Sequence, residues 1–187
     1  MDPGTHLITV ADREADIYDL FALPRPQNMD LLIRAASNRR VEADEQTGKL
    51  WDLLLEQPVQ GTTSVHLEHK PGQKAREVTL TLRWKPLSIL PPAPKSLHAV
   101  AEPIPLVAIL VTEADPPAGQ EPLCWLLLTT LPVETFLQAE QCVRWYRLRW
   151  LIERYHFVLK SGCRLEDLQL ETALRLERAL ATQGNRI

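Results

Sequence analysis

Proline spacing in the middle of the chain places the tightest limit on its fold. Eight of the 15 prolines lie between Pro86 and Pro117, and a helix of ordinary length cannot cross such a stretch unbroken. Between these prolines and the neighbouring glycines are short runs in which apolar and polar residues alternate, as in half-buried strands. A short helix is expected around 50–56, and proline tolerates only edge positions in a sheet. We therefore predict a mainly antiparallel β region, with strands at 63–68, 77–84, 98–101, 106–112 and 123–129.

The segments on either side of this region have different patterns. An apolar run at 6–11, a helical pattern at 13–23 and an apolar run at 29–35 predict strand, helix and strand, with the two strands parallel. From residue 130 the pattern is helical, as one bent helix or two, with Pro132–Glu134 in the first turn and Gly162 at the end. A last helix is expected over 165–181. The predicted fold class is α/β: 1–37 and 130–181 form the core, 38–129 form a β-rich insertion, and 182–187 are an unrelated tail.

Composition says more about the cellular compartment of the protein than about its function. The net charge is −3, and the three cysteines have no metal-binding spacing, which suits a reducing cytoplasm. The apolar run at 123–128 is far too short to span a membrane, and the N-terminus has no signal-peptide pattern. We therefore expect a cytoplasmic protein without a membrane partner.

One stretch departs from the acidic average of the chain. Between Arg144 and Arg164 there are six basic residues and one acid, Glu153, a net charge of +5. On a continuous helix, four of its polar side chains would share one face, about 130 degrees from the apolar stripe. A carboxylate among such groups either forms an ion pair with Arg149 or binds a divalent cation beside a phosphate. The polar set is Tyr146, Arg149, Glu153 and Lys160, and the apolar stripe is Leu148, Leu151, Ile152, Tyr155 and Leu159.

Asp12 follows directly after the first predicted strand. Ligands of α/β sheets bind at the carboxyl ends of the strands, so this position suits a metal-binding carboxylate, for which a distant helical Glu could be a second ligand. The alternative is structural, because an Asp at this position can cap the helix that follows.

Two motifs resemble segments of a known family. The segment Asp12-Arg13-Glu14-Ala15-Asp16 resembles the "DREAD" segment of bacterial cut-and-paste transposases. The residues Tyr146, Arg149, Glu153 and Lys160 fit the Y-x2-R-x3-E-x6-K signature of the same group, the DDE transposases of the insertion-sequence-four type. The resemblance also covers 123–129 and 132–134, and so runs from Thr9 to about Ala181. It implies an RNase H-like catalytic core, here a strand–helix–strand unit and a catalytic helix interrupted by the insertion.

The resemblance implies a role for each matching residue. Asp12 and Glu153 would be the second and third carboxylates of the Asp-Asp-Glu triad, and would bind Mg²⁺ or, as a substitute, Mn²⁺. Double-stranded DNA, as transposon ends and target, would be the partner, and the family acts as a dimer. Glu14 and Asp16 are expected to be helix-surface or salt-bridge residues, and His156 to have a solvent or core role. Asn38–Arg40 either contacts DNA or is a solvated loop. The expected DNA contacts are Tyr146, Arg149 and Lys160 on phosphates, Trp125 stacked on a flipped base and, as a weaker match, Arg34.

The first Asp of the triad has no counterpart in this sequence. Only eleven residues precede Asp12, and the acid among them, Asp2, lies in no predicted strand. We therefore expect a chain truncated at both ends, without the pairing domain and inactive alone, although its family cuts and joins DNA in the bacterial nucleoid. The alternatives are a catalytically dead DNA-binding remnant that interferes with the intact enzyme, and a relic with no role. A nuclease of the same fold is disfavoured by the Tyr-Arg-Glu-Lys spacing.

Overall fold

The computed structural model describes residues 4–67, 75–92 and 102–157. It forms two compact units, Met1–Tyr146 and Arg147–Ile187, which we describe separately. The strand predicted at 98–101, the helix predicted at 165–181, Lys160 and Gly162 lie outside the described residues.

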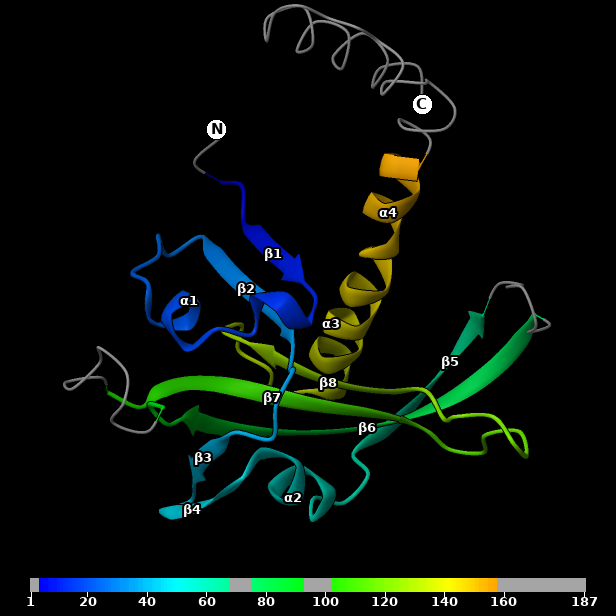
Figure 1. Ribbon diagram of the computed structural model, residues 1–187, viewed down its shortest axis with the longest axis horizontal. Coiled ribbons are helices and arrows are strands. Elements are labelled where there is room, and N and C mark those ends of the chain that lie inside the picture. The colour runs from blue at the N-terminus through cyan, green and yellow to red at the C-terminus, as the bar shows by residue number, and fades with distance from the viewer. Residues whose placement is uncertain (1–3, 68–74, 93–101, 158–187) are drawn as a thin grey trace, which may run out of the picture. The chain divides into compact units, whose positions relative to one another are not determined.

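The first unit is built on one mixed sheet (Figure 1). Two neighbouring strands are parallel, as predicted, and every other pairing is antiparallel. The strand order is β1-β2-β8-β7-β6-β3-β4, with β5 paired to β6. The antiparallel strands therefore continue directly from the parallel pair through β8. The strands are β1 (Leu7–Ala11), β2 (Met29–Arg34), β3 (Arg40–Ala43), β4 (Gln46–Lys49), β5 (Gly61–Leu67), β6 (Arg76–Ile89), β7 (Ile104–Glu113) and β8 (Cys124–Thr129).

Strand β6 extends five residues beyond the predicted end at Trp84 and passes through Pro86. Its first part, to Leu82, pairs with β5, and its last two residues, Ser88 and Ile89, pair with β3. Pro86 lies between these two stretches, where only the pairing with β7 is present. A missing N–H is tolerated at such a local edge, which explains why this proline does not end the strand.

The central strands are buried on both faces. Alternate residues of a strand point to opposite faces, so Leu106, Ala108 and Leu110 of β7 join one core cluster and Val107, Ile109 and Val111 join the other. Leu31 and Ile33 of β2 pack in the first cluster and Leu32 in the second. This double burial explains the nearly continuous apolar runs of these strands.

The helical segment predicted at 13–23 is interrupted. The structure has a 3-10 turn, η1 (Arg13–Ala15), and a short helix, α1 (Tyr18–Ala22), so the prediction of one helix is wrong. The cause is Asp16, whose carboxylate accepts a hydrogen bond from the Ala36 amide at 2.7 Å and pairs with Arg39. These long-range contacts hold the chain away from a helical path. The helix expected around 50–56 is confirmed as α2 (Leu50–Leu55).

The helical stretch after residue 130 begins later than expected. Pro132–Glu134 are not helical, and α3 covers Phe136–Leu148. The Gln138 amide donates to the Thr135 hydroxyl at 3.4 Å, while the Gln138 side chain accepts from the amides of Glu134 and Thr135. This reciprocal pattern is a capping box, which the sequence analysis did not recognise. Of the helices in the described part of the chain, none is long and apolar enough to cross a membrane.

The apolar stripe expected on this helical stretch does not lie on one continuous helix. The stretch is not continuous: α3 ends at Leu148, and α4 (Trp150–Phe157) begins after a turn at Arg149. Leu148, Leu151 and Ile152 are 54%, 47% and 52% exposed. The face of α3 that packs on the sheet consists instead of Ala139, Cys142, Val143 and Tyr146.

Candidate active site

Asp12 stands at the carboxyl end of β1, as the sequence predicts. Its side chain also caps the following turn, because Oδ1 accepts a hydrogen bond from the Arg13 amide at 2.9 Å. The carboxylate is 27% exposed, so solvent or a ligand can reach it. The two interpretations of Asp12 are therefore compatible: the cap fixes the position of a carboxylate that remains accessible.

Arg34 lies beside Asp12 because β1 and β2 are parallel. In the register of this pair Ala11 faces Ile33, so the next residues of both strands emerge at the same edge of the sheet. The Arg34 Nη1 atom is 3.9 Å from Asp12 Oδ1. Its Nη2 atom donates to the carbonyl of Cys124 at 3.2 Å. The guanidinium thus links β8 to the end of β1.

Tyr146 reaches the same carboxylate from α3. Its side chain is 4% exposed, and its hydroxyl donates to Asp12 Oδ1 at 3.3 Å. It follows Ala139, Cys142 and Val143 at helical spacing on the face that packs on the sheet. The packing of α3 on the sheet therefore places the Tyr146 phenol at the end of β1.

Trp125 completes this group from β8. It is partly buried against the second core cluster, and its ring centroid lies 5.3 Å from that of Tyr146, with 64° between the ring planes. An edge-to-face pair of this kind is favourable beyond its apolar contact. Four residues from four separate elements thus meet at one place, which we call the Asp12 pole: Asp12, Arg34, Trp125 and Tyr146.

The other predicted site residues belong to the second unit. Arg149 occupies the turn between α3 and α4, and Glu153 lies within α4. The structure describes the backbone of Glu153 but not its side chain, and Lys160 is outside the described residues. The expected single helical face rested on an unbroken helix, which the turn at Arg149 does not provide. The roles of these three residues remain predictions.

Cys124 adjoins the site, although its position immediately before Trp125 was the only sequence signal for this. Its carbonyl accepts a hydrogen bond from Arg34. Burial raises the pKa of its thiol, opposed by the nearby guanidinium groups of Arg34 and Arg13. Cys142, by contrast, is a core residue, and burial raises the pKa of its thiol to about 11.

The second aspartate of the DREAD segment is structural. The Asp16 side chain is 0% exposed and pairs with Arg39, whose side chain is 14% exposed. The expectation of a salt bridge for Asp16 is thus confirmed. Arg39 is neither a solvated loop residue nor displayed for DNA, and Asn38 caps α2 by accepting from the Trp51 amide at 2.9 Å. Arg40 begins β3 and is exposed.

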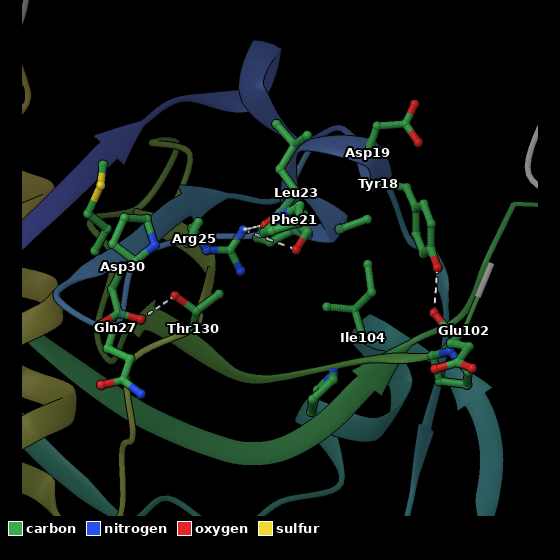
Figure 2. Close-up of a pocket in the computed structure, with 16 residues that line it drawn as sticks. Tyr18, Asp19, Phe21, Leu23, Arg25, Gln27, Asp30, Glu102, Ile104 and Thr130 are labelled. Atoms are coloured by element: carbon green, nitrogen blue, oxygen red, sulfur yellow. Dashed lines mark hydrogen bonds between the residues drawn. The ribbon is translucent and has the colours of Figure 1, made fainter.

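A cavity of about 830 Å³ lies away from this pole, where β2 begins (Figure 2). Its polar groups bond to one another: Tyr18 donates to the Glu102 carbonyl at 2.5 Å, and Thr130 donates to Asp30 at 2.5 Å. Arg25 donates to the carbonyls at the end of α1, including Phe21 at 3.1 Å. No residue of the Asp12 pole lines this cavity, so it is separate from the candidate site.

Metal binding at the Asp12 pole would draw on a hard oxygen ligand. A partly exposed carboxylate at a strand end suits Mg²⁺ or a similar divalent ion. Within the described ranges, no group of three His, Cys, Asp or Glu side chains is close enough to bind a metal ion. Asp12 therefore fits as one ligand of a site that needs further ligands.

Comparison with known protein families gives one match that covers nearly the whole chain. Residues 3–183 match the sequence profile of the family described as "Transposase DDE domain".

Proposed function

This chain belongs to the transposase DDE domain family, and from this premise we propose that the Asp12 pole is where it acts on DNA. Membership implies a transposase function, binding to DNA and use of divalent metal ions. The observation that carries the proposal is the convergence of an accessible carboxylate, a guanidinium, a phenol and an indole at one end of the parallel strand pair. A carboxylate of this kind can bind a divalent ion, and a cationic or hydrogen-bonding group beside it can contact a DNA phosphate.

The metal ligands in this proposal are Asp12 and Glu153. As in the insertion-sequence-four type that the sequence resembles, they would be two of three carboxylates around Mg²⁺, with Mn²⁺ as a substitute. The bound ion would activate the attacking and leaving oxygens in cleavage of the transposon end and in strand transfer. The protein's part is to fix Asp12, which the Arg13 amide and the Tyr146 hydroxyl do from two directions.

The DNA contacts in this proposal have separate roles. Arg149 and Lys160 contact phosphates, which position DNA without reading its sequence, and Arg34 does so from β2. Trp125 stacks on an unpaired base. Tyr146 contacts both Trp125 and Asp12. We therefore propose that it fixes the position of the Trp125 ring relative to the Asp12 carboxylate, in addition to contacting a phosphate.

We further propose that the fold is an RNase H-like core interrupted by the β region. In this division, residues 1–37 and 130–181 supply the core, 38–129 supply the insertion and 182–187 are a tail. The strand order β1-β2-β8 supports a direct connection between core and insertion, since β8, the last strand of the insertion, pairs with β2 of the core. DNA ends and target DNA are the proposed partners.

A second candidate function is DNA binding without cleavage. The observation in its favour is the Arg34 guanidinium, which lies 3.9 Å from Asp12 Oδ1, where a metal ion would otherwise bind. Two carboxylates hold both metal ions poorly for an in-line displacement. For the 187-residue chain by itself, we therefore expect DNA binding without nicking or strand transfer.

Binding and cleavage of a labelled duplex test these proposals together. We expect weak binding that falls steeply as salt rises, and no nicking with Mg²⁺ or Mn²⁺. Arg149→Gln should weaken binding to all sequences alike, while Lys49→Gln, which removes an exposed charge on β4, serves as the charge-matched control. Glu153→Gln should leave binding intact or improve it, because it removes a negative charge near phosphates.

Two results contradict this interpretation. Equal loss of binding in the Arg149 and Lys49 variants would show that net charge alone holds DNA. Cleavage by the unmodified chain that Glu153→Gln abolishes would show that two carboxylates suffice.

A further inference from the structure

Three groups converge on one oxygen of Asp12. Oδ1 accepts from the Arg13 amide at 2.9 Å and from the Tyr146 hydroxyl at 3.3 Å, and it lies 3.9 Å from Nη1 of Arg34. Only the last of these carries a full positive charge. Arg34 therefore holds a position beside the carboxylate that a divalent cation would also seek.

The Arg34 contact differs from the other aspartate–arginine pair of this segment. Asp16 and Arg39 are 0% and 14% exposed, and Asp16 also accepts from the Ala36 amide, so that pair is fixed and enclosed. Asp12 and Arg34 are 27% and 21% exposed, and their closest atoms are 3.9 Å apart, beyond hydrogen-bond distance. The pair is loose and open to solvent, which allows it to exchange partners.

A second anchor keeps Arg34 near the site when it leaves Asp12. Its Nη2 atom donates to the Cys124 carbonyl at 3.2 Å, one residue before the indole proposed to stack on a base. A guanidinium held in this way can turn toward a phosphate without leaving the pole, and it binds phosphate in a bidentate manner.

We propose that Arg34 occupies the cation position beside Asp12 until a DNA phosphate draws its guanidinium away, so that DNA binding opens the metal site. This inference rests on the proposed metal-binding role of Asp12 and adds a regulatory role for Arg34. Because two cations beside one carboxylate repel each other, Arg34 lowers metal affinity in the free protein. By linkage, metal and DNA then each raise the affinity for the other.

The experiment measures Mn²⁺ binding to the full 187-residue chain by electron paramagnetic resonance, without DNA and with a saturating duplex oligonucleotide. Binding of Mn²⁺ to the duplex alone is measured separately and subtracted. The variants are Arg34→Gln, Arg34→Lys and, as a control that removes an equal charge at an exposed residue of β4, Lys49→Gln. Circular dichroism and thermal unfolding verify that each variant folds.

We expect DNA to raise the Mn²⁺ affinity of the unmodified chain by about fivefold or more. Arg34→Gln should raise the DNA-free affinity by a similar factor and reduce the effect of DNA. Without DNA, Arg34→Lys, which keeps the charge, and Lys49→Gln should bind Mn²⁺ as the unmodified chain does. An Arg34→Gln chain whose DNA-free affinity is unchanged or lower overturns the inference, as does a Lys49→Gln chain that gains as much affinity.

Asp12→Asn separates this inference from the proposed function. If Asp12→Asn binds Mn²⁺ as the unmodified chain does, or if no chain binds Mn²⁺, the metal assignment of Asp12 fails and the role of Arg34 falls with it. If Asp12→Asn loses Mn²⁺ while Arg34→Gln gains none, the assignment of Asp12 stands and only the role of Arg34 is refuted.

Discussion

Asp12 and Asp16 are four residues apart in one segment and have opposite environments. Asp12 remains 27% exposed at the end of β1, whereas Asp16 is 0% exposed and paired with Arg39. The difference arises from the chain reversal at η1, which leaves the first carboxylate at the sheet edge and turns the second toward the link between β2 and β3. Accessibility, and not residue type, separates the candidate ligand from the structural acid.

A second buried acid at the residue scale is Glu113, the last residue of β7. Its side chain is 1% exposed, pairs with Arg76 of β6 and accepts from the Leu123 amide at 3.0 Å. The hydrogen bond from Arg76 holds the pKa of the Glu113 carboxyl below its ordinary value, against burial and with help from Leu123. The ionised carboxylate therefore ties the end of β7 to the start of β8.

We predict that Glu113→Gln lowers the free energy of unfolding at pH 7 by about 1.5–3 kcal/mol, the usual contribution of a hydrogen bond to a charged group. Because the folded pKa is lowered, this stability is fully present above the unfolded pKa of about 4.3 and is lost as pH falls through the folded pKa. Urea unfolding of the unmodified chain and of Glu113→Gln at several pH values measures this difference in stability. Glu77→Gln, at a side chain 70% exposed, is the control. A difference that persists unchanged in strong acid would contradict the role of the ionised pair.

At the scale of elements, α3 is held against the sheet by a close approach at Gly61. A Cβ atom on Gly61 would lie 2.1 Å from Cδ2 and 2.5 Å from Cε2 of the Phe136 ring. Gly61 opens β5 and Phe136 opens α3, after the capping box at Thr135. The absence of a side chain at Gly61 therefore sets how closely α3 and its Tyr146 can lie to the sheet.

We predict that Gly61→Ala lowers the free energy of unfolding by about 1–3 kcal/mol, as overpacking usually does. Phe136→Leu removes the ring, so Gly61→Ala should cost clearly less in that background. Urea unfolding of the two single variants and the double variant gives the coupling. Strictly additive effects would show that the two residues do not meet.

Element types could largely be predicted from sequence, whereas element ends could not. The periodicity of apolar residues and the positions of proline and glycine predicted the strands β1, β2, β5 and β8 and the helix α2. The break at Asp16–Ile17 and the late start of α3 depend on partners that periodicity does not show: the Ala36 amide for Asp16 and the Gln138 side chain for Thr135. The apolar stripe was wrong for a related reason, since it required a helix without the turn at Arg149.

At the scale of the whole molecule, the site depends on contacts between distant parts of the sequence. The Tyr146–Asp12 hydrogen bond spans 134 residues, and Arg34 reaches Cys124 across 90. Motif resemblance predicted roles for Asp12, Arg34, Trp125 and Tyr146 one by one. The order β1-β2-β8 and the packing of α3 on the sheet explain why the four residues meet. The contact of Arg34 with Asp12 could not be predicted, because parallel register is not encoded in either strand alone.

Photo-crosslinking to DNA tests the central claim, that DNA is bound at the Asp12 pole, most directly. Duplexes that carry 5-iodouracil at successive positions near one end are irradiated with the full chain, and crosslinked peptides are identified by mass spectrometry. Trp125 is only partly buried, whereas Trp84 is a core residue that is 9% exposed. Trp51 packs on the other face of the sheet. We predict crosslinks at Trp125. In Asp12→Asn and Arg34→Gln, the yield of these crosslinks should fall only in proportion to any loss of DNA affinity. Crosslinks at Trp51 or Trp84 with none at Trp125 or Tyr146, from a chain that still binds the duplex, would contradict the assignment.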